Sequence, residues 1–266
     1  MIATLPMYDW PEVREATDAW WAGLARHLRK AGFEAPDRLT RSGGASAQWR
    51  RPDLLVSQTC GFPLMHDLRG RLEVLATPAY NVEGCSGTSY SSVIVVPVDG
   101  GVSRLEDLEG ATAAYNAADS LSGHLALKCV FAPLGRNGRF FDQLVTSGSH
   151  RASMQLVCDA KADVAAIDCV SFALARRHRP ELAAGLAVIA HGPAAPALPY
   201  VTAAGRPAGE IARLKHALSA AAADPALAGA RQALFIAGLE FLSPDAYHRV
   251  LDLEAECAAL GYAALA

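Results

Sequence analysis

Short apolar runs alternate with helically spaced apolar residues along most of the chain. Runs rich in Val, Ile, Leu and Ala predict seven strands, at residues 2–5, 53–57, 72–76, 91–98, 111–115, 163–167 and 186–190. Strands separated by helical segments are typical of α/β proteins with a largely parallel sheet. We therefore expect an α/β fold.

The first helix shows this periodicity most clearly. Residues that suit a buried face recur at helical spacing, and they are Val13, Thr17, Trp20, Trp21, Leu24 and Leu28. Pro11 suits the first turn of this helix and Gly32 suits its end. We expect Trp20 and Trp21 to lie in the core.

The first residues of two later helices also carry a signal. Ser103, with Glu106 three positions later, predicts a capping box, and Gly110 would end this short helix. Ser243, directly before Pro244, predicts the start of the last helix.

Two stretches rich in Gly or Pro, residues 83–90 and 192–199, interrupt the strand pattern. The second is too rich in proline to be helical, so it predicts extended backbone. If both stretches cross between lobes, residues 1–90 and 191–266 form lobe 1, and residues 91–190 form an inserted lobe 2.

Composition narrows the function classes. The 266 residues are 52% hydrophobic and carry 24 Lys and Arg against 27 Asp and Glu, a formal charge of -3. This excludes intrinsic disorder and argues against a broad basic face for nucleic acid. No apolar stretch reaches the roughly 20 residues of a membrane span. Residues 1–15 do not resemble a secretory signal, which leaves localisation open between periplasm and cytoplasm.

The six cysteines form neither a CxxC motif nor a Cys/His cluster, so we expect no metal and no cofactor. Cys60 and Cys85 both lie beside glycines in loops, and we expect them to be neighbours in the first lobe. They are the candidate disulfide, with free buried cysteines as the alternative.

The most informative segment follows the strand predicted at residues 111–115. Ser120, Ser122 and Gly123 stand where a helix begins, so two hydroxyls lie beside unpaired backbone N–H groups at the positive end of the helix dipole. This arrangement suits an oxyanion. The alternative is ordinary N-capping by one of the serines. The segment is neither a phosphate-binding Walker loop nor a GxGxxG motif.

A second Gly/Ser loop, residues 147–149, precedes His150 and Arg151. A cation gains nothing from the dipole at a helix start, so a bound anion would explain the pair. The alternative is that Arg151 is solvated and His150 caps a neighbouring segment. Asp168 ends a buried strand, a frequent location of ligand contacts in open α/β sheets.

Six motifs in this order and spacing resemble the phosphate/phosphite/phosphonate-binding (PhnD-like) family of ABC-transporter substrate-binding proteins. They lie at residues 90–96, 105–110, 116–123, 147–150, 162–168 and 193–200. The resemblance implies a two-lobed periplasmic-binding-protein fold of the second type, with the ligand in a cleft between the lobes.

The resemblance also implies particular site residues. The family's anion-binding helix start corresponds to Ser120, Ser122 and Gly123, and its loop histidine corresponds to His150. Family members usually carry an acidic residue after this histidine, which pairs with a ligand amine. Arg151 stands there in this chain, so we do not expect an aminophosphonate.

The first lobe should supply the opposite wall of the cleft. Tyr8, Gln58 and Thr59 follow predicted strands and are candidates for that wall. Core packing of Tyr8 and a turn role for Gln58 are the alternatives. Tyr90 and Ser91 lie at the first crossing, where they would contact ligand or serve the hinge.

We therefore expect a monomeric, non-enzymatic binding protein for a small anionic ligand, with an ABC transporter permease as its possible partner. A cytoplasmic ligand-sensing module is one alternative. An enzyme using Cys60 or Cys85 with His150 or His124 is another, although no nucleophile motif is present.

Overall fold

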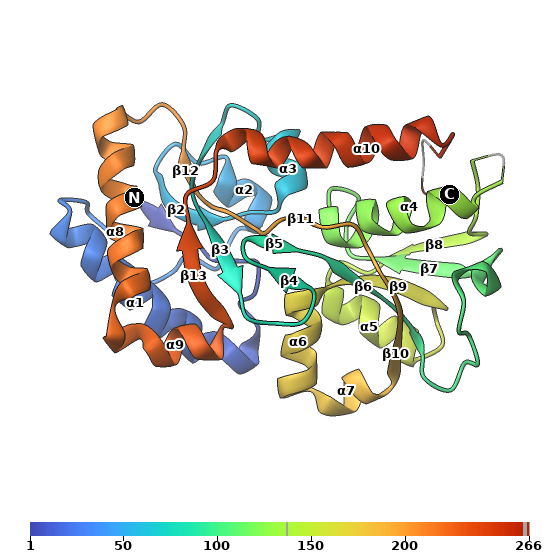
Figure 1. The fold of residues 1–266 in the computed structure, drawn as a ribbon. Coiled ribbons are helices and arrows are strands. Elements are labelled where there is room, and N and C mark those ends of the chain that lie inside the picture. The colour runs from blue at the N-terminus through green and yellow to red at the C-terminus, as the bar shows by residue number, and fades with distance from the viewer. Residues whose placement is uncertain (137, 263–264, 266) are drawn as a thin grey trace. The chain divides into compact units, whose positions relative to one another are not determined.

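The computed structural model describes residues 1–136, 138–262 and 265. Contacts divide the chain into two compact units, which we call unit 1 and unit 2 (Figure 1). Unit 1 comprises Met1–Asn81, Ser86–Thr88 and Pro196–Ala246, and unit 2 comprises Val82–Cys85, Ser89–Ala195 and Tyr247–Ala266. The sequence places residues 247–266 in lobe 1, whereas the contacts group them with unit 2.

Unit 1 is built on one mixed sheet with the strand order β1-β2-β12-β3-β13. These strands are β1 (Ile2–Ala3), β2 (Leu54–Gln58), β3 (Leu72–Tyr80), β12 (Tyr200–Ala203) and β13 (Ile236–Glu240). The helices of unit 1 are η1 (Pro11–Val13), α1 (Arg14–Lys30), α2 (Ala45–Trp49), α3 (Gly61–Met65), α8 (Ala208–Ala223), η5 (Pro225–Leu227) and α9 (Ala228–Ala233).

Unit 2 has a second mixed sheet, in the order β10-β6-β9-β7-β8. Its strands are β6 (Ser92–Pro97), β7 (Thr112–Tyr115), β8 (Gln143–Thr146), β9 (Val164–Asp168) and β10 (Leu186–His191). Its helices are η2 (Leu105–Leu108), η3 (Leu121–Leu125), α4 (Ala126–Phe131), η4 (Ala132–Leu134), α5 (His150–Cys158), α6 (Cys169–His178), α7 (Pro180–Ala184) and α10 (Arg249–Ala259).

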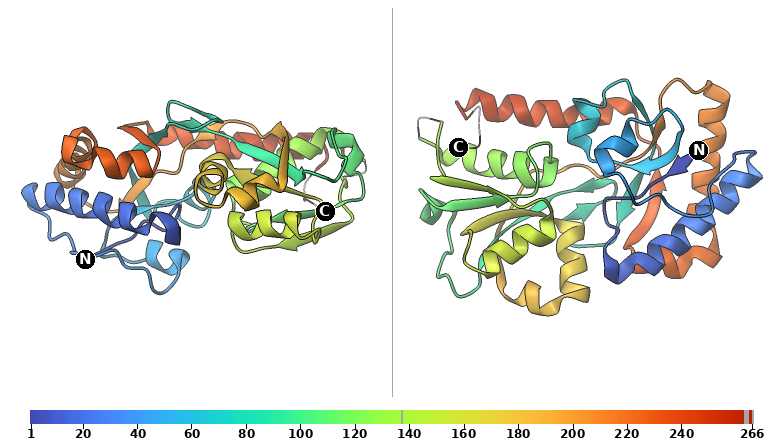
Figure 2. Two further views of the ribbon diagram at one scale, coloured as in Figure 1. Left: turned by 90° about the horizontal axis from the view of Figure 1, so that it is seen from below. Right: turned by 180° about the vertical axis from the view of Figure 1, so that it is seen from behind.

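The remaining short elements lie where the chain passes between the units. They are β4 (Cys85–Ser86), β5 (Ser89–Tyr90), β11 (Ala195–Pro196) and the 3-10 helix η6 (Pro244–His248). Within unit 2, α10 packs against α4, and the right-hand view of Figure 2 shows the two helices side by side. This packing is why the C-terminal segment belongs with unit 2. Among the described residues, no helix combines the length and apolarity that crossing a membrane requires.

The α/β prediction is confirmed, and each of the seven predicted strands overlaps an observed one. The expectation of largely parallel sheets is wrong. β6 runs antiparallel to both β9 and β10, and β12 runs antiparallel to both β2 and β3. β6 and β12 are the first strands to join a five-stranded sheet after each crossing. No helix lies between the crossing and the strand, and a parallel connection between strands needs such a helix.

Helix signals in the sequence were accurate to about one turn. Trp20 and Trp21 are fully buried, as predicted. The short helix η2 begins one residue later than the Ser103 box implies, because the Arg104 amide donates to the Asp107 carboxylate at 3.2 Å. Gly110 follows with φ +78°, and the Ser243 hydroxyl accepts the Asp245 amide at 3.3 Å at the start of η6.

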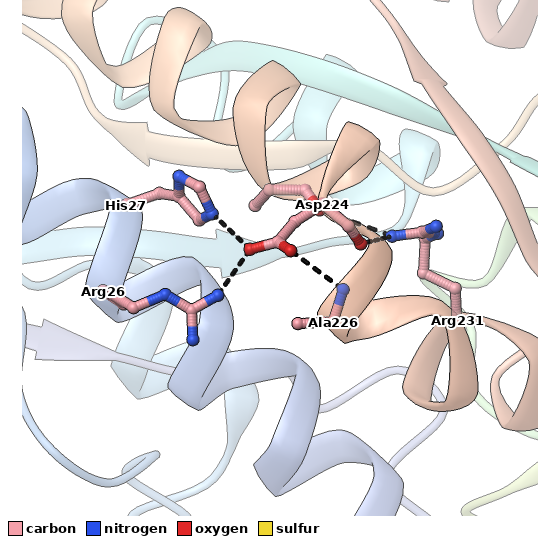
Figure 3. A network of polar contacts seen from close by, with 6 residues as sticks. Arg26, His27, Asp224, Ala226 and Arg231 are labelled. Carbon is pink, nitrogen blue, oxygen red and sulfur yellow. Dashed lines mark hydrogen bonds and ion pairs between the residues drawn. The ribbon is translucent and has the colours of Figure 1, made fainter.

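One polar cluster ties α1 to the segment that follows α8 (Figure 3). The Asp224 carboxylate accepts hydrogen bonds from Arg26, from His27 at 2.9 Å, and from the Ala226 amide at 2.9 Å. The Asp224 carbonyl accepts from Arg231 at 2.8 Å. We call these five residues the Asp224 cluster. The His27 hydrogen bond is the largest influence that lowers the pKa of Asp224, to about 2.

The described cysteines are all free thiols. Cys60 belongs to unit 1 and precedes α3, whereas Cys85 belongs to unit 2. The Cys85 sulfur lies 3.4 Å from that of Cys169, at the start of α6. This neighbour differs from the Cys60 partner that the sequence suggests, because sequence position alone did not reveal how the start of α6 returns to the crossing.

Candidate functional site

The predicted anion-binding helix start lies in unit 2, directly after β7. Ser120 is the N-cap, and its hydroxyl accepts the Gly123 amide at 3.0 Å. The chain then forms a wide π-turn, η3, that continues into α4. Ser120 therefore performs the capping role, while the hydroxyl of Ser122, one residue into the helix, is left for another partner.

That partner is His150. The Ser122 Oγ lies 2.8 Å from Nε2 of His150, although the two residues are 28 positions apart in the chain. Ser122 is held from the other side by Ser92, whose hydroxyl donates to the Ser122 carbonyl at 2.8 Å. The structure thus brings together two of the predicted site residues and adds Ser92 as a positioning residue.

His150 is the first residue of α5, whose N-cap, Ser149, accepts the Ala152 amide at 3.1 Å. Part of the residue is exposed, but the Nδ1 atom is shielded from solvent. Burial lowers the pKa of His150 to about 4. The imidazole is therefore neutral at pH 7.

Gly123 has no room for a side chain. A Cβ atom at this position would lie 1.8 Å from Oδ1 of Asn116. This Asn116 oxygen is buried and has no hydrogen-bond partner among the described residues. An unsatisfied buried oxygen is uncommon in a folded protein and calls for an explanation such as an absent water or ligand. The backbone at the helix start is thus closely approached by a polar group that capping does not use.

A hollow of about 210 Å³, open solvent included, lies beside this helix start within unit 2. Its polar lining consists of Tyr90, Ser91, Ser92 and Ser122, and none of its lining residues carries a charged side chain. Asp168 is not among them. Its carboxylate caps α6 by accepting the Ser171 amide at 2.9 Å, and it lies opposite Ser92 in the β6–β9 register.

The three candidates from unit 1 are all buried. Tyr8 packs edge-on against Tyr80, with ring centroids 5.4 Å apart, and the Gln58 amide donates to the Tyr80 hydroxyl at 2.8 Å. Tyr8, Gln58 and Tyr80 line a hollow of about 300 Å³ within unit 1, open solvent included, that also contains Trp20 and Tyr200. Thr59 does not line it, and its amide donates to the Pro199 carbonyl at 3.1 Å.

Ser122, His150 and the backbone at the start of η3 offer hydroxyl, imidazole and amide donors, and none of the residues that line the neighbouring hollow is charged. Such donors suit an oxyanion, whose oxygens only accept hydrogen bonds. A Ser–His pair at 2.8 Å also resembles a nucleophile and its base, but a catalytic pair is usually oriented by a third group. The shielded Nδ1 atom of His150 has no such partner among the described residues. No group of three or more His, Cys, Asp or Glu in the described part of the chain is placed to hold a metal ion.

Comparison with protein families identifies the chain. Residues 51–247 match the model of the phosphonate-binding family, described as "ABC transporter, phosphonate, periplasmic substrate-binding protein". The chain belongs to this family. Its members are solute-binding proteins of transporters, which bind a small ligand and deliver it to a permease. A search of curated proteins found no significant match.

Solved structures agree with this family in fold. A binding-protein component of an ABC phosphonate transporter from Pseudomonas aeruginosa has a TM-score of 0.79 at 18% identity, covering 98% of this chain and 87% of that chain. PhnD1 from Prochlorococcus marinus, in complex with methylphosphonate, has a TM-score of 0.75 at 15% identity, covering 97% and 98%. A histidine kinase sensor domain similar to periplasmic binding proteins has a TM-score of 0.57 at 18% identity, covering 91% and 98%. The predicted periplasmic-binding-protein fold is confirmed.

Sequence reasoning missed several residues around the two hollows. Ser92 and Asn116 both lie in motifs noted above, but only the structure shows that they touch Ser122 and Gly123. Tyr80 and Tyr200 in unit 1 were missed because each ends or begins a strand without a local polar signal. Only the strand order shows that both tyrosines lie at strand ends beside the hollow of unit 1, so the sequence could not have suggested them.

Proposed function

We propose that the protein binds a small oxyanion of the phosphonate or phosphate kind and presents it for ABC-type uptake. The observation that carries the proposal is the meeting of Ser122 and His150 at a helix start, at 2.8 Å. Membership of the phosphonate-binding family supports it.

Binding would replace one hydrogen bond by several. In the structure, Ser122 and His150 satisfy each other. An arriving oxyanion accepts from the Ser122 hydroxyl, from the imidazole Nε2 in its protonated tautomer, and from backbone amides at the start of η3. Because these donors are already held by Ser92 and by the cap at Ser120, little ordering is needed on binding.

The neutral imidazole sets the expected pH behaviour. Above about pH 6 the His150 ring donates without carrying charge, because burial holds its pKa near 4. Once the ligand's own ionisation is subtracted, the affinity should then vary little between roughly pH 6 and 8.5. A steep fall in that range would mean that the bound form holds the imidazolium cation.

Unit 1 would supply the rest of the binding site. Tyr8 and Gln58 line a hollow whose other residues are mostly aromatic or aliphatic, which suits the uncharged part of an organic oxyanion. We propose that the two units close around the ligand as the lobes of binding proteins do, and that Tyr90 and Ser91 take part at the crossing. Thr59 and Asp168 would support the site, since both are engaged in their own units.

The test is a thermal-shift screen followed by calorimetry. The probes are methylphosphonate, 2-aminoethylphosphonate, phosphite, phosphate, sulfate and acetate, each at fixed ionic strength. A ligand that binds the native state raises the melting temperature by an amount that grows with the logarithm of its concentration relative to its Kd. We expect methylphosphonate, phosphite or phosphate to stabilise the protein, and 2-aminoethylphosphonate to be weaker than methylphosphonate, because Arg151 stands where a carboxylate would pair with its amine.

The Ser122→Ala variant connects the result to the site. Losing one hydrogen bond to a charged group costs about 1 to 3 kcal/mol, or roughly a 5- to 150-fold loss of affinity. Ser243→Ala, whose hydroxyl caps η6, is the matched control and should bind normally. If no anion stabilises the protein, or if Ser122→Ala binds as tightly as the native chain, the proposed function is wrong.

Ligand sensing is a second candidate, because a histidine kinase sensor domain shares the fold. Uptake of the radiolabelled ligand separates the two. Cells that lack the gene should lose uptake if the protein serves a permease, and should keep uptake but lose a transcriptional response if it serves as a sensor.

A further inference from the structure

Two cysteines that play no part in the anion site lie against each other in unit 2. The Cys129 sulfur, on α4, is 2.8 Å from the Cys257 sulfur, on α10, although 128 positions separate them in the chain. A covalent disulfide has a length of about 2.0 Å, so only a small movement separates the two thiols from a bond. The packing of α10 against α4 holds them there.

The pair is accessible from one side. Both cysteines line a solvent-open hollow of about 840 Å³, together with Pro133, His191 and Glu256. Cys129 is partly exposed, whereas Cys257 is almost fully buried on the side of α10 that faces α4. A small disulfide can therefore reach the sulfur pair without unfolding the protein.

The electrostatics favour a reactive thiolate. The hydrogen bond from Cys129 lowers the pKa of Cys257, and the positive charge of Lys128 adds to that effect. The same shared proton raises the pKa of Cys129. A pair that shares one proton ionises more readily at one sulfur than a lone buried thiol does.

We propose that Cys129 and Cys257 form a dithiol site that closes to a disulfide by exchange with a small-molecule disulfide. One thiolate of the pair attacks a sulfur of the small disulfide, forms a mixed disulfide and releases one thiolate. The second cysteine loses its proton, attacks the mixed disulfide at the protein sulfur and releases the other thiolate. The protein gives up two electrons and two protons, and one small disulfide becomes two thiols.

The bond would act on the helix that carries the anion site. η3 and α4 form one continuous helical segment, with Ser122 near its start and Cys129 in its later turn. Leu253, one turn before Cys257, lines both the hollow beside Ser122 and the hollow beside the two sulfurs. The disulfide would therefore fasten the C-terminal helix against the back of the anion site. The proposal does not depend on which ligand binds there.

The experiment treats the folded, fully reduced chain with oxidised glutathione, blocks remaining thiols with iodoacetamide, and maps peptides without reduction. We expect a cross-linked peptide that joins Cys129 to Cys257. Closing so long a loop should raise the melting temperature by about 5 °C or more. Cys129→Ser and Cys257→Ser should each abolish both effects, while Cys158→Ser, at a lone cysteine on α5, should abolish neither.

The outcome on the native chain alone decides the proposal, so it stands even if a serine variant folds poorly. Recovery of Cys129 and Cys257 as alkylated thiols after oxidation would overturn it. So would a map in which the only cross-link joins Cys85 to Cys169, the second close pair, at 3.4 Å. Oxidation of the urea-unfolded chain is the control, and there the Cys129–Cys257 link should lose its dominance.

Discussion

The Asp224 cluster of unit 1 and the Ser122–His150 cluster of unit 2 both join segments far apart in the sequence, but their polar groups are used differently. Asp224 receives four hydrogen bonds from the residues in Figure 3, through its carboxylate and its carbonyl. Around Ser122, by contrast, two groups that can donate, the Ser122 hydroxyl and the His150 imidazole, share one hydrogen bond.

This difference suits the Asp224 cluster to stabilising the fold and the Ser122–His150 pair to binding a ligand. A polar cluster that satisfies itself with charged donors has nothing left for a ligand, and it stabilises the fold. A cluster of neutral donors with one hydrogen bond between them keeps donor capacity for another molecule. Substitutions around Ser122 and His150 should therefore affect ligand binding, and substitutions in the Asp224 cluster should affect stability alone.

The largest effect is expected at Gly123. In Gly123→Ala the new methyl group meets the Asn116 oxygen at 1.8 Å, so the helix start or Asn116 must move. We expect calorimetry with the tightest anion from the screen to show a loss of affinity of about 100-fold or more, because recognition depends on sub-ångström placement of donors.

Gly209→Ala is the matched control for that change. Gly209 lies in the first turn of α8 in unit 1, and a Cβ there meets nothing within 4 Å. This variant should bind normally and should be slightly more stable, since alanine favours a helix over glycine. Equal affinities for the two variants would contradict the proposal that the helix start at Gly123 binds the ligand.

An intermediate effect is expected from the pH dependence of stability. The folded-state pKa of His150 is lowered from about 6.5 to about 4. Below pH 6.5 the unfolded chain therefore binds a proton that the native chain does not. Stability is fully present above about pH 6.5 and falls as the pH drops toward 4, by about 2 kcal/mol between pH 7.5 and 5.

Urea unfolding of the native chain and of His150→Gln at both pH values measures this contribution. The glutamine variant should lack that part of the acid loss, because its amide does not titrate. An identical pH dependence in the two proteins would show that His150 is not desolvated in the native state.

The smallest effect is expected at Asp224. Asp224→Asn keeps an oxygen for the Ala226 amide but removes the charge that Arg26 and His27 contact. We expect the melting temperature to fall by roughly a few degrees, and ligand affinity to stay unchanged, because exposed ion pairs contribute little individually.

Acid titration sharpens the Asp224 prediction. The carboxylate's pKa is lowered to about 2, chiefly by the His27 hydrogen bond. Its contribution is therefore present above about pH 4 and is lost as the pH falls toward 2. Circular dichroism in this range should show a steeper acid loss for the native chain than for Asp224→Asn, and a change in anion affinity in the variant would contradict the separation of the two clusters.

The sequence by itself determined the local elements. The periodicity around Trp20 and Trp21 predicted a buried helix, seven apolar runs predicted strands, and the Ser/Gly helix start after β7 predicted oxyanion binding. The structure confirms the helix and the strands, because helix periodicity and strand burial depend on neighbours within a few residues. Oxyanion binding stays a prediction.

Only the tertiary structure decided which distant residues meet. The family resemblance placed Ser122 and His150 at one site, but the sequence did not reveal that β6 and β12 run antiparallel to their neighbours or that Cys129 meets Cys257 across 128 positions. Such contacts depend on the order and direction of strands and on helix packing, and these are set by burial of apolar faces throughout the chain. The residue pattern of one segment does not specify the strand order or the helix packing.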